Sequence, residues 1–269
     1  PSGRPENERT RFSPCNGRRQ EMLRALQHGV MSALWIQALL VNTVLIALAQ
    51  RTTVLTRSGW VHAAALGTIL WGCLGWSGWL AVVAYLCLGS LVTKIGFQNK
   101  QNRGLAEARG GQRGPENVWG SAAVGAILAL LIGAGVEPRE LMLVGFAASF
   151  AAKLADTFGS EIGKRFGRTT VLITSLRAVP PGTEGAISLE GTLASAAGSI
   201  AMTLVMLALQ LVPSWPVAVL VMLVGLVATL GESLLGALVQ DRVAWLSNEL
   251  VNALQTLVAA VLAMLLMVL

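Results

Sequence analysis

The segment Ala152-Lys153-Leu154-Ala155-Asp156-Thr157-Phe158-Gly159-Ser160-Glu161-Ile162-Gly163-Lys164 places four charged side chains within an otherwise apolar stretch. In a helix, which turns by about 100° per residue, the polar side chains fall within a stripe of about 140°. They are Lys153, Asp156, Thr157, Ser160, Glu161 and Lys164. Charge at membrane depth costs free energy and usually marks function. Oxygen ligands suit Mg²⁺ and ammonium groups suit phosphate, so this face is predicted to hold a metal-bound phosphorylated substrate. The alternative is an internal salt-bridge network that only locks two helices together.

The composition predicts an all-α, polytopic transmembrane helical bundle of about seven or eight spans. The chain of 269 residues is 54% hydrophobic and 13% charged, and its mean hydropathy is +0.64, which excludes an ordinary soluble domain. The candidate spans, each long enough to cross about 30 Å of hydrocarbon, are 30–50, 60–76, 79–93, 118–136, 141–162, 191–211, 216–240 and 250–269. The pair within 60–93 is either two short spans broken at Gly75-Trp76-Ser77-Gly78 or one re-entrant hairpin.

Two basic Gly-rich loops are expected on one side of the membrane, cytoplasmic or stromal, and their basic residues lie within 94–113 and 164–177. With eight spans the basic tail 1–24 would lie on the opposite side. Either 30–50 does not cross, or 60–93 crosses once, or the tail is an exception. We divide the chain into a polar, basic arm, 1–29, disordered or interfacial, and a transmembrane catalytic domain, 30–269. The net charge of +6 indicates phosphate groups or anionic membrane lipid as partners, and no nucleic acid.

Glycine, lysine and arginine in the first loop are the ingredients of a phosphate cradle, although a solvated loop has the same composition. The second loop ends in Pro180-Pro181-Gly182-Thr183-Glu184-Gly185 and leads into a helix start with Ser188 as the expected N-cap. Neither a P-loop nor a Rossmann fingerprint occurs in the chain. Glu232 lies within span 216–240, and Asn248, Asn252 and Gln255 share a helical face that either binds a ligand or joins helices.

Several strings from about Leu88 to the C-terminus resemble the integral-membrane family that includes the phytyl-phosphate kinase of vitamin E synthesis. They are Leu88-Gly89-Ser90-Leu91, Thr93-Lys94, Gly104-Leu105-Ala106-Glu107, Gly110-Gly111, Ala155-Asp156-Thr157, Ser160-Glu161-Ile162-Gly163, the Pro-Pro-Gly string, Gly191-Thr192-Leu193-Ala194-Ser195, Ser233-Leu234-Leu235-Gly236-Ala237 and 248–252. Glu184 and Glu232 stand where aspartates are expected in relatives. The resemblance implies transfer of a phosphoryl group from a nucleoside triphosphate, with CTP favoured, to an isoprenoid monophosphate lipid such as phytyl phosphate. It favours a plastid membrane, with a bacterial inner membrane as the alternative.

We assign the role of each site residue from its side-chain chemistry and not from the family resemblance. Asp156, Glu161 and Lys153 are the predicted catalytic residues, and Mg²⁺ is the predicted cofactor. The predicted metal ligands are Asp156, Glu161, Glu184 and Glu232. The predicted phosphate- and nucleotide-binding residues are Lys94, Lys100, Arg103, Arg113, Lys164, Gly182, Thr183, Ser160, Asn248 and Asn252. An acceptor that already carries phosphate needs no dedicated general base.

Two other functions need similar residues. A nucleotidyltransferase that forms a CDP-linked lipid would also use Mg²⁺ and a triphosphate. A carrier or flippase for a phosphorylated lipid would also place charges at membrane depth, but the chain shows no obvious inverted repeat and both basic loops are expected on one side.

Overall fold

The computed structural model describes residues 33–239, 243 and 245–269. The predicted arm 1–29 lies outside these residues. Within them, six helices are long and apolar enough to cross a membrane, and the shorter apolar helix Ala33–Ala49 precedes them. The six are α2 (Arg57–Lys94), α4 (Pro115–Gly133), α5 (Arg139–Phe166), α6 (Leu189–Ala208), α7 (Trp215–Val239) and α8 (Asn248–Val268). The predicted transmembrane helical bundle is confirmed.

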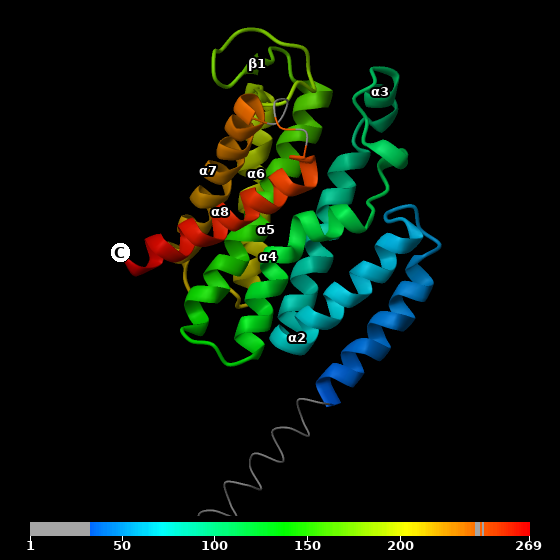
Figure 1. Cartoon of the computed structure of the whole chain (residues 1–269), viewed down its shortest axis with the longest axis vertical. Coiled ribbons are helices and arrows are strands. Elements are labelled where there is room, and N and C mark those ends of the chain that lie inside the picture. The colour runs from blue at the N-terminus through cyan, green and yellow to red at the C-terminus, as the bar shows by residue number, and fades with distance from the viewer. Residues whose placement is uncertain (1–32, 240–242, 244) are drawn as a thin grey trace, which may run out of the picture.

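Helix α2 is a hairpin of two helical halves rather than one straight span (Figure 1). The break is at Gly75, whose φ of 65° and ψ of −156° are essentially restricted to glycine. Both ends of the hairpin meet Arg113: the Thr56 N–H donates to the Arg113 carbonyl at 3.0 Å, and the Arg113 guanidinium lies close to Gly89. The two predicted segments of 60–93 therefore run back to back, with the break at the first residue of the expected Gly-Trp-Ser-Gly turn.

Helix α5 is the centre of the bundle and packs against α2, α4, α6, α7 and α8. Its most apolar window is 78% buried, whereas the corresponding windows of the other spans are 33–44% buried. The polar residues of α5 therefore face protein and not lipid. This is the arrangement in which ionisable side chains are tolerated at membrane depth.

Two loops cover the same end of the bundle (Figure 1). The first connects α2 to α4 and contains the short helix α3 (Phe97–Asn102) and the 3₁₀ turn η1 (Ala108–Gly111). The second connects α5 to α6 through the antiparallel strands β1 (Val171–Leu172) and β2 (Ala186–Ile187). The predicted N-cap is confirmed, because the Ser188 hydroxyl accepts from the Gly191 N–H at 3.1 Å. The two basic loops thus lie on one side, as expected.

Candidate active site

A cavity of about 330 Å³ opens at the loop-bearing end of the bundle and is lined by α2, α4, α5, α6, α7, α8 and both loops. This volume is in the range of small-molecule sites. The predicted site residues in its lining are Arg113, Lys153, Asp156, Ser160, Glu161, Lys164, Gly182, Thr183, Glu184, Glu232, Asn248 and Asn252. Lys94, Lys100 and Arg103 lie outside the lining. The folded chain therefore brings most of the predicted residues to one place.

Lys153 is the most enclosed cation of the cavity. Its Nζ donates to Asp156 Oδ2 at 2.5 Å, three residues along α5, and to Asn252 Oδ1 of α8 at 2.8 Å. These two acceptors offset the cost of burying the ammonium group. The pair also fixes the orientation of the Asp156 carboxylate at the cavity wall.

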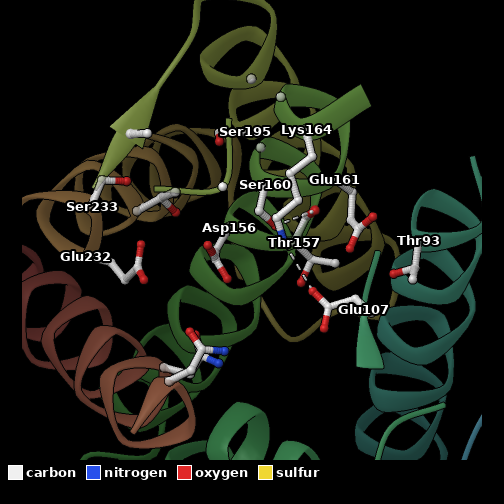
Figure 2. A pocket seen from close by; sticks show the side chains of 18 of the residues that line it. Thr93, Glu107, Asp156, Thr157, Ser160, Glu161, Lys164, Ser195, Glu232 and Ser233 are labelled. Carbon is white, nitrogen blue, oxygen red and sulfur yellow. Dashed lines mark hydrogen bonds and ion pairs between the residues drawn. The ribbon is translucent and has the colours of Figure 1, made fainter. Parts of the chain in front are cut away.

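Carboxylates from three elements gather on the α7 side of the cavity. Asp156 and Glu232 face one another (Figure 2), and Glu184 lines the same cavity. The loop that carries Glu184 rests on α7, where Gly185 lies against Ala237 and Ser233. We call Asp156, Glu184 and Glu232 the acidic end of the cavity.

The four predicted metal ligands do not form one cluster. Within the described part of the chain, no three His, Cys, Asp or Glu side chains are grouped closely enough to hold a metal ion. Their oxygen chemistry nevertheless fits Mg²⁺, which in phosphoryl-transfer sites is bound through one or two carboxylates together with substrate phosphates rather than by a cage of protein ligands. Asp156 and Glu232 would supply these two carboxylates.

Glu161 and Lys100 form a pair that the sequence interpretation did not contain. The side chain of Lys100 is fully buried, and its Nζ donates to Glu161 Oε2 and to the Thr93 carbonyl at 2.9 Å. Glu161 lies away from Asp156 and Glu232 (Figure 2). The Lys100 ammonium group is already held by Glu161 and the Thr93 carbonyl, and Lys100 itself lies outside the cavity lining, so this structure does not place it where it would bind phosphate. Glu161 reaches the cavity wall, but as the partner of Lys100.

The other two basic residues outside the lining also have different surroundings from those expected. The Arg103 guanidinium is exposed and donates to the Lys164 carbonyl at 3.1 Å, so it ties its loop to α5. Lys94 is exposed at the end of α2 and borders a smaller cavity beside Phe97 and Gly111. By contrast, Lys164 reaches the main cavity and pairs with Glu107 at 3.4 Å.

Sequence reasoning missed Tyr85, Ser121 and Asn117 in the lining. The Tyr85 hydroxyl accepts from Arg113 Nη1 at 3.2 Å. Tyr85 is the only tyrosine of the chain, and a lone phenol within an apolar span was the signal that would have identified it.

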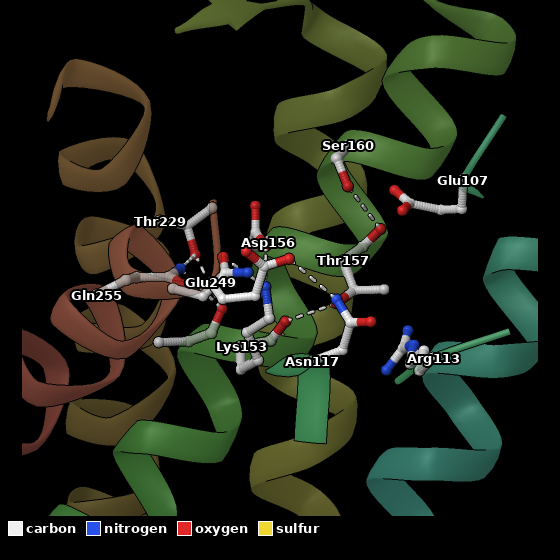
Figure 3. Close-up of polar contacts among 12 residues, drawn as sticks. Glu107, Arg113, Asn117, Lys153, Asp156, Thr157, Ser160, Thr229, Glu249 and Gln255 are labelled. Carbon is white, nitrogen blue, oxygen red and sulfur yellow. Dashed lines mark hydrogen bonds and ion pairs between the residues drawn. The ribbon is translucent and has the colours of Figure 1, made fainter. Parts of the chain in front are cut away.

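The polar face of α8 joins helices, which is one of its two expected roles, and ligand binding by this face stays a prediction. Asn252 contacts Lys153 in the cavity, whereas Gln255 joins three helices. Its Nε2 donates to the Ala152 carbonyl of α5 and to Thr229 Oγ1 of α7, both at 3.1 Å (Figure 3).

Comparison with known proteins relates the chain to a family of membrane proteins. The family model described as integral membrane protein DUF92 matches residues 40–260. An uncharacterized membrane protein of Synechocystis sp. is 47% identical over 232 residues, which covers 85% of this chain and 90% of the relative. Protein VTE6, chloroplastic, of Arabidopsis thaliana is 40% identical over 243 residues, covering 87% of this chain and 72% of the relative. An uncharacterized membrane protein of Methanocaldococcus jannaschii is 28% identical, with coverage of 85% and 92%. No solved structure matches the chain.

Proposed function

The chain belongs to the DUF92 family of integral membrane proteins, and from this premise we propose that it is a membrane-embedded isoprenoid phosphate kinase. It transfers a phosphoryl group from a nucleoside triphosphate, with CTP favoured, to phytyl phosphate or a similar isoprenoid monophosphate. The product is the isoprenoid diphosphate. The relationship to the chloroplastic protein VTE6 and to a cyanobacterial membrane protein supports the resemblance of the motifs to the phytyl-phosphate kinase family and favours a plastid or bacterial membrane.

The observation that carries the proposal is a single cavity that combines cations and carboxylates inside a transmembrane bundle. Arg113, Lys153 and Lys164 supply positive charge, and Asp156 and Glu232 supply oxygen ligands. Phosphoryl transfer depends on positioning and on neutralising charge more than on covalent chemistry by the protein. The lining has the residue types that this reaction needs, and the apolar helices around it suit an isoprenoid tail.

In the proposed reaction, a phosphate oxygen of the acceptor attacks the γ-phosphorus of the triphosphate. The bond between the γ-phosphorus and the bridging oxygen breaks, and the nucleoside diphosphate leaves with the electron pair. The acceptor oxygen is already ionised, so no protein side chain has to remove a proton. Bound Mg²⁺ would supply neutralisation of the charge on the transferred group.

Residues of the chain would bind the metal and the phosphate groups. Asp156 and Glu232 would hold the metal with the triphosphate oxygens, and Lys153 keeps Asp156 in place at 2.5 Å. Ser160, Thr183 and the backbone at Gly182 line the cavity. The two hydroxyls donate to the Thr157 and Pro180 carbonyls in this structure and would turn to donate to phosphate oxygens when substrate binds. Lys164 adds positive charge near the loops.

Product identification tests the proposal. The protein, reconstituted in lipid nanodiscs, is incubated with phytyl phosphate, Mg²⁺ and each γ- or α-labelled triphosphate in turn, and the lipid product is identified by mass spectrometry. Phytyl diphosphate together with the nucleoside diphosphate is the expected result. A CDP-linked lipid with release of pyrophosphate would replace the kinase by a nucleotidyltransferase. Absence of turnover, together with movement of phytyl phosphate across sealed vesicles, would replace it by a carrier.

A further inference from the structure

We propose that the cavity has two chemically distinct ends, and that Arg113, Tyr85 and Ser121 form a cationic end that binds the phosphate of the lipid acceptor. This inference rests on the proposed function and deepens it, because it assigns each phosphorylated substrate to its own part of the site. The acidic end, formed by Asp156, Glu184 and Glu232, would then receive the metal-bound triphosphate.

Arg113 is a cation without a carboxylate partner at the cavity wall. In the described residues, the ion pairs involve Lys100, Arg109, Lys153, Lys164 and Arg168 but not Arg113. Its contacts are the Tyr85 hydroxyl at 3.2 Å and the face of the Tyr85 ring at 5.7 Å. The guanidinium is half-buried and also lies close to Gly89. Because Tyr85 accepts from only one of its N–H groups, donors remain for an anion. Phosphate oxygens match its planar fork.

Tyr85 and Ser121 add hydroxyl groups beside this cation. Both side chains are buried, at 5% and 6% exposure, yet both belong to the cavity lining. The Tyr85 ring packs edge-on against Phe150 with a centroid distance of 5.6 Å, which holds the hydroxyl in place. A phosphate at Arg113 would therefore meet preorganised donors, and the site would lose little side-chain entropy on binding.

The position of Tyr85 suits a headgroup that arrives from the lipid. Tyr85 precedes the last residue of α2, Lys94, by nine residues, which places it about 14 Å along the helix from the loop-bearing end. It lies on α2, and Ser121 lies on α4, two helices that pack together. Their outer faces expose apolar residues such as Leu91 and Ile127 to the membrane. The cationic end is thus at membrane depth behind a wall of apolar helices.

The acidic end has the opposite character. It carries the carboxyl groups of Asp156, Glu184 and Glu232, and its cation Lys153 is already paired with Asp156, so its oxygen ligands suit a phosphate that arrives with a metal ion. It lies under the loop of residues 180–187, which is on the water-facing end of the bundle. Figure 3 shows Arg113 on the side of Asn117 and Thr157, away from Asp156. Thr157 of α5 also lines the cavity, so the two substrates would meet along α5.

Binding of phytyl phosphate without Mg²⁺ and without nucleotide tests the cationic end directly. Labelled phytyl phosphate is titrated onto the nanodisc-reconstituted protein, and steady-state KM values for both substrates are measured in parallel. Arg113→Met should weaken phytyl phosphate binding by about tenfold or more, as expected for a charge-assisted hydrogen-bonded contact. Its KM for the triphosphate should change by less than about twofold. Arg57→Met is the matched control, because Arg57 is exposed at the start of α2 and outside the cavity lining.

If Arg113→Met does not fold, two more conservative substitutions test the same phosphate contact. Tyr85→Phe removes one oxygen and keeps the packing against Phe150, and Arg113→Lys keeps the charge but loses the planar fork. Each should weaken phytyl phosphate binding by about threefold to tenfold while leaving a monodisperse protein.

The outcomes separate this inference from the proposed function. Wild-type binding that is lost in the Arg113 and Tyr85 variants supports the cationic end even if no diphosphate is formed, in which case only the kinase assignment fails. Phytyl phosphate binding that is unchanged in these variants overturns the inference. The same holds if the variants raise the KM for the triphosphate instead, or if the wild-type protein does not bind phytyl phosphate.

Discussion

Removal of the Lys100 ammonium group probes how the loop between α2 and α4 is held on α5. The structure places this lysine in full burial, with Glu161 and the Thr93 carbonyl as its acceptors. Lys100→Met keeps most of the side-chain volume but leaves the Glu161 carboxylate, at 3% exposure, without its cation. The uncompensated charge is the source of the expected effect.

The expected loss is large for a single substitution. Breaking a buried ion pair from one side costs about 3–5 kcal/mol, because the remaining charge stays desolvated. Removing both charges together costs much less, so the double variant Lys100→Met with Glu161→Gln should lose less than about 1.5 kcal/mol. The double variant should therefore be more stable than Lys100→Met alone, which is the signature of a pair and not of two independent contacts.

The measurement is a titration with SDS in mixed micelles, followed by tryptophan fluorescence and circular dichroism, which gives the free energy of unfolding of each variant. Lys94→Met is the control, since this lysine lies near the same loop but is exposed, and its loss should stay within about 0.5 kcal/mol. A Lys100→Met protein within about 1 kcal/mol of the wild type would refute the reasoning. So would a double variant that is no more stable than Lys100→Met, because the two side chains would then not be coupled.

Three further substitutions address the cavity and the first helix. Asp156→Asn should lower kcat by about a hundredfold or more, because a neutral amide is a poor Mg²⁺ ligand. Unchanged elution in size-exclusion chromatography would show that the variant keeps its fold. Turnover at the wild-type rate would contradict a role of Asp156 in metal binding. Gly185→Ala should raise the KM for the triphosphate, because the added methyl group would collide with α7 and displace the 180–187 loop. Gly104→Ala is the control, because Gly104 has a similar positive φ but open space around it, and it should leave that KM unchanged. Trp79→Phe removes the N–H that donates to Asn42 Oδ1 at 2.9 Å, so amide hydrogen exchange in the helix Ala33–Ala49 should accelerate by roughly fivefold to tenfold. Equal exchange rates in the variant and the wild type would show that this bond does not hold the helix.

The polar stripe of α5 could be predicted from the sequence because it depends only on local periodicity. Lys153, Asp156 and Lys164 repeat at helical spacing within an apolar stretch, and burying such a stripe requires a central helix in a membrane protein. The structure places this helix at the centre, with the stripe in the cavity wall. The acidic residue of α7, Glu232, was predicted for the same reason.

The surroundings of Lys100 could not be predicted in this way. A lysine in a polar, glycine-rich loop has the sequence pattern of a solvated residue, and its burial depends on α3 folding back onto α5, 61 positions further along the chain. The contact between Arg113 and Tyr85 is also non-local, because it depends on the hairpin of α2. Hydrophobic periodicity contains no information about such pairings.

The geometry of α5 explains why its two carboxylates serve different partners. Asp156 and Glu161 are five positions apart, which at about 100° per residue separates their directions by about 140° around the helix axis. Two side chains that diverge this widely cannot both point at one small cation such as Mg²⁺, whose oxygen ligands lie at about 2.0–2.1 Å. Asp156 therefore faces Glu232 on α7, while Glu161 faces Lys100 and the end of α2 (Figure 2). A metal site on this helix has to recruit its second carboxylate from another helix, and Glu232 is the one that the fold places opposite Asp156.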